Sequence, residues 1–194
     1  MLRVVVFASG RGSNLENLIN ASKKSNTYKI VGVISNNSNS GAIQIAKKNN
    51  ISSFHFSLKN FINEEEFVNS LIQELQNLNC QLVVLAGYMK KVPKMVISKF
   101  ENKIINIHPA LLPEFGGEGM YGENVHKAVL ESKNKYSGAT VHFVNKDYDK
   151  GNILLQEKIE VFENDTIDSL AKRVLEVEHK ILPLAIEVLA KKIN

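Results

Sequence analysis

Two polar side chains with catalytic potential stand in the run Asn106-Ile107-His108-Pro109. On an extended strand alternate residues share one face, so we expect Asn106 and His108 to project together, with Cα atoms roughly 6.7 Å apart. A carboxamide can donate a hydrogen bond to an oxyanion, and an imidazole can carry a proton. An isolated pair of this kind is more often structural. The end of a strand in an open α/β sheet, however, is where such folds place their active sites, which favours chemistry here.

A carboxylate that could serve this pair lies further along, in the segment from Val141 to Gly151. Asp149 precedes a glycine, and an aspartate at such a position is usually only a turn residue. The alternative is that Asp149 pairs with an imidazole, which would raise its protonated fraction and fix its tautomer. His142 alternates with apolar residues, and we expect it to be structural.

A turn rich in glycine and serine, Ser9 to Asn14, follows the first apolar run. Glycines allow close approach of the backbone to an oxyanion, and helix N-terminal amides point at it, so the turn can hold a phosphate. It is not a dinucleotide fingerprint, because Leu15 occupies the third glycine position and no acidic residue ends the next strand. A plain turn with Ser13 or Asn14 as helix N-cap fits equally well.

The composition excludes several other classes of function. The chain has 194 residues and a formal charge of +4, with lysines scattered singly or in pairs, which favours small anionic ligands over nucleic acid. Cys80 is the single cysteine, so we expect no disulfide, no cysteine-based metal site and a reducing cytoplasm as the location. The five histidines show no metal-ligand spacing, and we expect no metal. The apolar run over residues 1–8 is too short for a membrane helix.

Apolar runs alternate with segments of helical periodicity along the chain. This alternation predicts one α/β domain over residues 1–194, a Rossmann-like, doubly wound and mostly parallel sheet, closed by a long C-terminal helix. The expected strands cover residues 4–8, 30–34, 52–56, 82–86, 104–107, 139–144 and 153–161, the last two as a hairpin-like extension. The expected helices follow Leu15, cover residues 42–46, start at Asn63, cover 125–130 and run from about 167 to 190.

Four segments together resemble the folate-dependent formyltransferases: the turn at 9–14, LAGYMKKV at 85–92, NIHPALLP at 106–113 and VHFVNKDYDKG at 141–151. The resemblance spans essentially the whole chain and is greatest to members that act on glycinamide ribonucleotide in purine biosynthesis. It implies transfer of the formyl group of 10-formyltetrahydrofolate to the substrate amine. Members that act on initiator methionyl-tRNA or hydrolyse formyl-folate are similar in this core but add a domain, for which we expect no room in this chain.

The resemblance also implies a role for individual residues. Asn106 would donate to the oxyanion, while Asp149 would keep His108 protonated so that it relays a proton. The ribonucleotide would contact Gly12, Ser13, Asn14, Pro109 and Glu178. The folate would contact Met89, Lys90, Lys91, Val92, Asn106, Asn145, Lys146, Asp147, Tyr148 and Asp149.

Three positions depart from the pattern of the family. Glu64 stands where relatives carry a basic residue facing the folate tail, and Lys150, where a small residue is common, could pair with Asp149. The segment 116–122 is long and rich in glycine, and we expect it to form a mobile flap over the ribonucleotide. The alternatives are another formyltransferase, a formyl-folate hydrolase, and a nucleotide-binding module without chemistry. The intact set of Asn106, His108 and Asp149 argues against a binding module without chemistry. The sequence does not distinguish a monomer from a homodimer.

Overall fold

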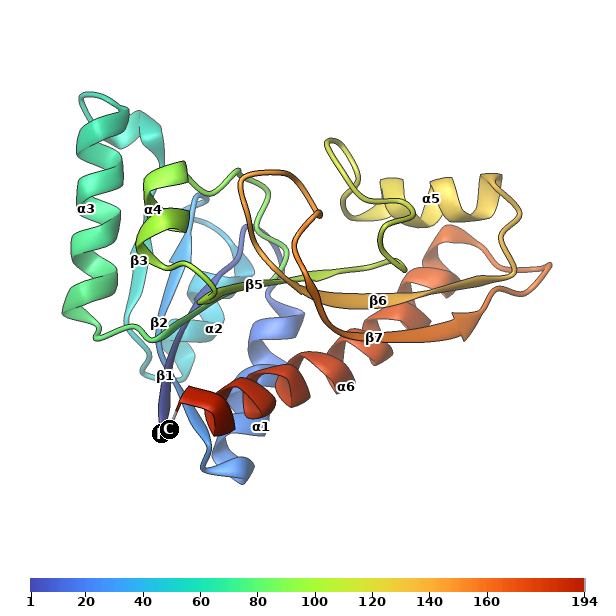
Figure 1. Ribbon diagram of the computed structural model, residues 1–194, viewed down its shortest axis with the longest axis horizontal. Helices are drawn as coiled ribbons and strands as arrows, with labels where there is room; N and C mark the ends of the chain where they lie inside the picture. The colour runs from blue at the N-terminus through green and yellow to red at the C-terminus, as the bar shows by residue number, and fades with distance from the viewer. Residues whose placement is uncertain (194) are drawn as a thin grey trace.

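The computed structural model describes residues 1–193, so Asn194, the last residue of the predicted domain, lies outside the described residues. One seven-stranded sheet with the order β3-β2-β1-β4-β5-β6-β7 organises the fold (Figure 1). The first five strands of the chain pair in parallel, whereas β6 and β7 are antiparallel to their neighbours. The strands are β1 Leu2–Phe7, β2 Tyr28–Ser35, β3 Ser53–His55, β4 Leu82–Leu85, β5 Ile104–His108, β6 Tyr136–Phe143 and β7 Ile153–Glu160. The predicted α/β class and the hairpin-like extension are confirmed.

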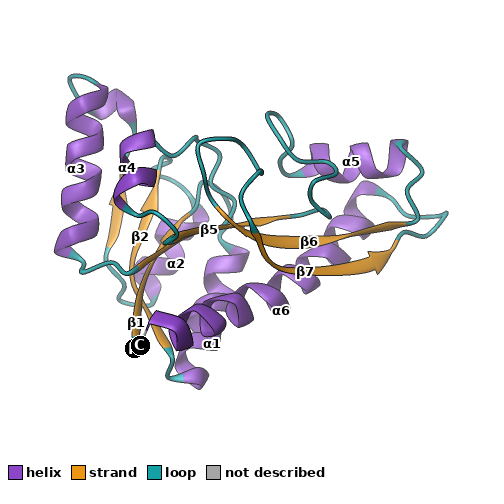
Figure 2. Cartoon of the chain, in the orientation of Figure 1, coloured by secondary structure: helices purple, strands orange, loops and turns teal. Residues whose placement is uncertain are grey.

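Helices cover both faces of this sheet (Figure 2). They are α1 Ser13–Ser25, α2 Gly41–Lys48, α3 Glu64–Asn77, α4 Lys94–Lys99, α5 Glu123–Glu131 and α6 Ile167–Ile193, with a 3₁₀ turn, η1, at Leu58–Asn60. Apolar residues of α1, α2 and α6 pack on one face, and those of α3 and α4 pack on the other. The long C-terminal helix is confirmed as α6. Helix α4 was not predicted from the sequence.

The central strands are apolar on both faces because helices bury both of them. In β1, Val4 and Val6 belong to the core under α1 and α6, while Val5 and Phe7 belong to the core under α3 and α4. All four are fully buried, and each such side chain contributes roughly 1.5–3 kcal/mol. This double layer makes the sheet a rigid base for the loops at its edge.

Helix α3 begins as the sequence predicts. The Asn63 side chain accepts a hydrogen bond from the backbone N–H of Glu66, and the Glu66 carboxylate accepts one from the N–H of Ile62. The first bond satisfies an amide that the first helical turn leaves without a partner, and the second satisfies the amide of the residue before the cap.

The carboxyl ends of the parallel strands meet at one edge of the sheet. There β1 leads into Ser9, β4 leads into Gly87, and β5 ends at His108. The Ser9 N–H donates to the Gly87 carbonyl at 3.0 Å, which brings two of these loops together. The candidate site is built on this edge.

Candidate active site

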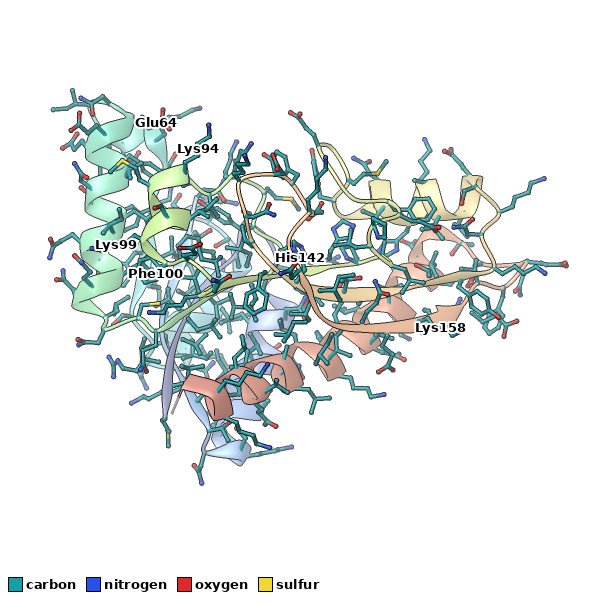
Figure 3. The ribbon with its side chains drawn as sticks, in the orientation of Figure 1. Glu64, Lys94, Lys99, Phe100, His142 and Lys158 are labelled. Carbon is teal, nitrogen blue, oxygen red and sulfur yellow. The ribbon has the colours of Figure 1, made fainter. Side chains whose placement is uncertain are left out.

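Four polar side chains converge where β5 lies beside β6. Asn106 and His108 share one face of β5, and the strand register places His142 of β6 beside Asn106. Asp149, from the loop after β6, reaches back over them. Its Oδ1 lies 3.5 Å from Asn106 Nδ2 and 3.4 Å from His142 Nε2, and its Oδ2 lies 3.7 Å from His108 Nδ1. The structure therefore brings together the three residues that the sequence assigns to catalysis, with His142 among them (Figure 3 labels His142).

Asp149 is held by the backbone as well as by the imidazoles. The Gly117 N–H donates to Asp149 Oδ2 at 2.9 Å, so the glycine-rich segment contacts this carboxylate directly. Asp149 itself has a φ of 53°, a left-handed conformation that aspartate tolerates better than most residues. Within the described residues the titratable side chains within 4 Å of its carboxylate are His108 and His142, so the suggested pairing with Lys150 is wrong.

The tautomer of His108 follows from its surroundings. The ring is 3% exposed, and its Nε2 lies 2.8 Å from the carbonyl oxygen of Phe115. A carbonyl only accepts, so Nε2 carries a proton and donates. Nδ1 is then the atom that gains or loses a proton, and it faces Asp149.

Burial decides the charge of His108. Desolvation lowers the pKa of His108 below 6.5 and outweighs the opposing effects of Asp149 and of the Phe115 carbonyl. The expectation that Asp149 keeps this ring protonated is therefore wrong. Burial also works against ionisation of Asp149, but the neighbouring His142 ring and the hydrogen bond from the Gly117 N–H prevail and lower the pKa of the carboxyl. Near neutral pH the site holds an ionised Asp149 beside a neutral His108.

His142 was expected to be structural, and the structure places it in the polar cluster. Its Nε2 lies 3.1 Å from Asn106 Nδ2, and its Nδ1 donates to the Phe143 carbonyl at 2.9 Å. Its position depends on the pairing of β5 with β6 and on the return of Asp149 seven residues later. The sequence signal that could have found it was the shared alternation of His142 with the polar Thr140, which indicates one polar face.

The turn before α1 presents free backbone amides. Gly12 has a φ of 84°, and a Cβ there would lie 2.9 Å from the Ala42 Cα, so a side chain would be strained and would clash with α2. Gly12 is also the N-cap of α1 and makes no side-chain capping bond. The reading of Ser13 or Asn14 as N-cap is therefore wrong. Both lie in the first helical turn, where the N–H groups have no partners within the helix.

Asn14 and Glu178 meet beside this turn, although 164 residues separate them. Asn14 Nδ2 donates to Glu178 Oε2 at 2.6 Å, and both side chains are more than nine-tenths buried. Burial raises the pKa of Glu178 to about 7, against a smaller opposite effect of the bond from Asn14. The Asn14 Oδ1 is buried without a hydrogen-bond partner. Glu178 is thus a buried polar group beside the turn, whereas a glutamate on a helix is usually solvated.

The two segments expected to enclose the folate lie side by side. Lys91 Nζ lies 4.8 Å from the ring centroid of Tyr148, which joins the chain after β4 to the loop after β6. Met89, Lys90 and the loop residues from Asn145 to Tyr148 are exposed, whereas Val92 is buried in the core under α3 and α4. Val92 therefore packs in the hydrophobic core, and it is also a candidate for the wall of the folate site.

A cavity of about 310 Å³ opens next to Asp149. Its lining comprises Leu112, Pro113, Asp149, Lys150, Gly151 and Ile153, and it includes none of the residues from Met89 to Val92. The cavity therefore lies beside the Asp149 carboxylate and does not coincide with the expected folate walls.

No group of three His, Cys, Asp or Glu side chains suited to a metal ion occurs among residues 1–193. In the same part of the chain, no helix combines the length and the apolar character needed to cross a membrane.

Known proteins resemble this chain over almost its whole length. The family model described as formyl transferase matches residues 2–186. The chain is 42% identical to the chloroplastic phosphoribosylglycinamide formyltransferase of Arabidopsis thaliana over 92% of its length, and it spans 62% of that relative. It is 38% identical to the phosphoribosylglycinamide formyltransferase of Haemophilus influenzae, covering 96% of this chain and 86% of that one.

A solved structure extends the likeness to three dimensions. Glycinamide ribonucleotide transformylase 1 from Symbiobacterium toebii superposes with a TM-score of 0.92 at 34% identity. The superposition covers 99% of this chain and 89% of that one. The chain therefore belongs to the formyl transferase family.

Proposed function

We propose that this protein transfers the formyl group of 10-formyltetrahydrofolate to the amine of N1-(5-phosphoribosyl)glycinamide, giving formylglycinamide ribonucleotide and tetrahydrofolate in purine biosynthesis. The observation that carries the proposal is the convergence of Asn106, His108 and Asp149 at the end of β5. The names of the similar proteins support the choice of substrate.

Two charges that develop during the reaction must be stabilised. When the amine attacks the formyl carbon, the carbonyl oxygen becomes negative and the attacking nitrogen becomes positive. The Asn106 carboxamide donates to the oxyanion, and the loss of one such donor costs roughly 3 kcal/mol of transition-state stabilisation. A strand position suits this task, because the donor is already oriented when the charge develops.

His108 handles the proton. Its Nε2 is occupied by the Phe115 carbonyl, so the neutral ring accepts the proton of the attacking amine at Nδ1. The imidazolium formed there faces the ionised Asp149, which stabilises it. As the bond from the formyl carbon to the folate nitrogen breaks, the ring returns the proton to that nitrogen. No covalent intermediate on the protein is needed.

The ribonucleotide phosphate binds at the turn formed by Gly12, Ser13 and Asn14. The free N–H groups and the positive end of the α1 dipole favour an anion there. Glu178, joined to Asn14, and Pro109, directly after β5, then face the glycinamide end. This arrangement directs the amine from the turn toward His108.

The folate binds between the segment from Met89 to Val92 and the loop from Asn145 to Asp149. Pterins are held by backbone hydrogen bonds in an apolar slot, which Met89 and Val92 can supply. The contact between Lys91 and Tyr148 joins these two segments. Residues 1–194 act as one formyltransferase domain in the cytoplasm, without metal, as a monomer or homodimer.

The test is the consumption of 10-formyltetrahydrofolate by the purified protein with and without glycinamide ribonucleotide. We expect consumption only when the ribonucleotide is present, with stoichiometric formation of formylglycinamide ribonucleotide. Equal consumption without any amine would indicate a formyl-folate hydrolase and overturn the proposal. Activity with a sugar-nucleotide amine and none with glycinamide ribonucleotide would indicate a different formyltransferase.

A further inference from the structure

A buried serine links the loops that carry the two binding segments. Ser9 lies two residues beyond β1 as the first residue of the turn from Ser9 to Asn14, and it is 9% exposed. Its Oγ accepts a hydrogen bond from the backbone N–H of Met89 at 2.8 Å and donates to the Asn36 Oδ1. One hydroxyl therefore uses both its donor and an acceptor site on different loops of the catalytic edge.

The bond to Met89 supports a segment that has few other supports. The chain leaves β4 through Gly87, whose φ is 70°, and Met89 and Lys90 are exposed. The Ser9 N–H also donates to the Gly87 carbonyl at 3.0 Å. The backbone N–H of Ser9 therefore holds the chain at Gly87, before this segment begins. The Ser9 hydroxyl holds it at Met89, from which the segment continues to Val92.

The glycine turn has separate support from α2. The Ala42 N–H donates to the Gly10 carbonyl at 3.2 Å, and Gly12 packs directly against Ala42. Gly41 lies so close to the Arg11 carbonyl that a Cβ there would be 2.4 Å from the oxygen. Loss of the Ser9 hydroxyl therefore leaves this turn in place and releases only the segment after β4.

We propose that Ser9 is a positioning residue that holds the segment from Met89 to Val92 in the conformation required for folate binding. It acts through the Met89 backbone and does not contact the reacting atoms. The inference rests on the proposed folate role of that segment. Its consequence is a selective one: removing the hydroxyl weakens folate binding and leaves ribonucleotide binding and the chemical step intact.

The experiment compares Ser9→Ala with wild type, using Ser22→Ala as a matched control. Ser22 lies in α1, and its hydroxyl bonds only within that helix, to the Ile19 carbonyl. Isothermal titration with tetrahydrofolate, which carries no formyl group, measures folate binding without turnover. Hydrogen exchange of the peptide that covers residues 85–92 reports on the Met89 amide directly.

For Ser9→Ala we expect faster exchange at Met89 and a Kd for tetrahydrofolate raised about fivefold to tenfold, as for one lost hydrogen bond. The folate KM should rise similarly, whereas kcat and the Kd for glycinamide ribonucleotide should stay within about twofold. Asn36→Ala should have a smaller effect, because Ser9 can still accept from Met89. Ser22→Ala should match wild type.

Unchanged tetrahydrofolate affinity in Ser9→Ala would overturn the inference. So would an equal loss of both affinities together with a lowered Tm, since this would indicate a general structural role. If wild type bound no tetrahydrofolate while Ser9→Ala still accelerated exchange at Met89, the hydrogen-bonding role of Ser9 would stand. The proposed function would then fail.

Discussion

The Nε2 atom of His108 lies 2.8 Å from the carbonyl oxygen of Phe115, while Nδ1 of the same ring faces Asp149. The Phe115 backbone, directly before the glycine-rich segment, thus fixes one ring nitrogen as a donor and leaves the other to exchange protons. The same segment orients Asp149 through the Gly117 N–H. Backbone groups of residues 115–117 therefore position both His108 and Asp149.

Asp149→Asn should lower the pKa of His108 further. The Asp149 carboxylate raises this pKa against the larger effect of burial, and the substitution removes that opposing charge. NMR titration of labelled histidine would measure the change. A higher pKa of His108 in the variant would show that the carboxylate does not act on the ring as the structure indicates.

His108→Ala should lower kcat by about 10²- to 10⁴-fold, the usual contribution of a positioned acid or base. The Kd for glycinamide ribonucleotide should change little, because the proposed phosphate contacts lie at the turn before α1. Steady-state kinetics and calorimetry would separate the two effects. Retention of most of the turnover would remove His108 from the proposed role.

Gly116→Ala should displace Asp149, although Gly116 is not one of the proposed catalytic residues. A Cβ at this position would lie 2.6 Å from Leu112 Cδ2 and 3.1 Å from Asp149 Cβ, and Leu112 is buried. We expect kcat to fall about 10- to 100-fold, since small displacements of a catalytic group are costly. Glu118→Ala, an exposed change in the same segment, serves as the control. Equal activity of the two variants would contradict the expectation.

Glu178→Gln should change how stability depends on pH. Burial raises the pKa of Glu178 to about 7 from its ordinary 4.5, so folding favours the protonated carboxyl. That contribution is complete below about pH 4.5 and is lost as the pH rises through about 7. Relative to wild type, the variant should therefore gain about 3 kcal/mol in free energy of unfolding between about pH 4.5 and pH 8. Urea unfolding across this range would measure the difference, and a difference independent of pH would refute the assignment.

Much of the fold could be predicted from local patterns. The central strands are recognisable because burial on both faces requires continuous apolar runs, as in Val83-Val84-Leu85. The start of α3 at Asn63 was predicted, and in the structure the Asn63 side chain caps the helix. Helix α4 escaped prediction because six residues are too few to show a helical period.

The candidate site was predictable where one strand contains its residues, as for Asn106 and His108. The place of His142 in the polar cluster was not predicted, because it depends on a strand pairing across 36 residues. The charge of His108 was not predictable either, because it depends on how deeply the Phe115 segment covers the ring. Such burial is a property of tertiary packing, which the residue types around His108 in the sequence do not encode.

The pairing of β5 with β6 gives the site a further dependence, on strand register. Side chains alternate along β6, so a slip of one residue would turn His142 toward the apolar residues of α6 and leave a valine or phenylalanine beside Asn106. Thr140 opposes such a slip, since its hydroxyl donates to the Ala110 carbonyl at 2.6 Å and accepts from the Leu112 N–H at 3.1 Å. Thr140 thereby helps to hold the face of β6 that presents His142 to Asn106.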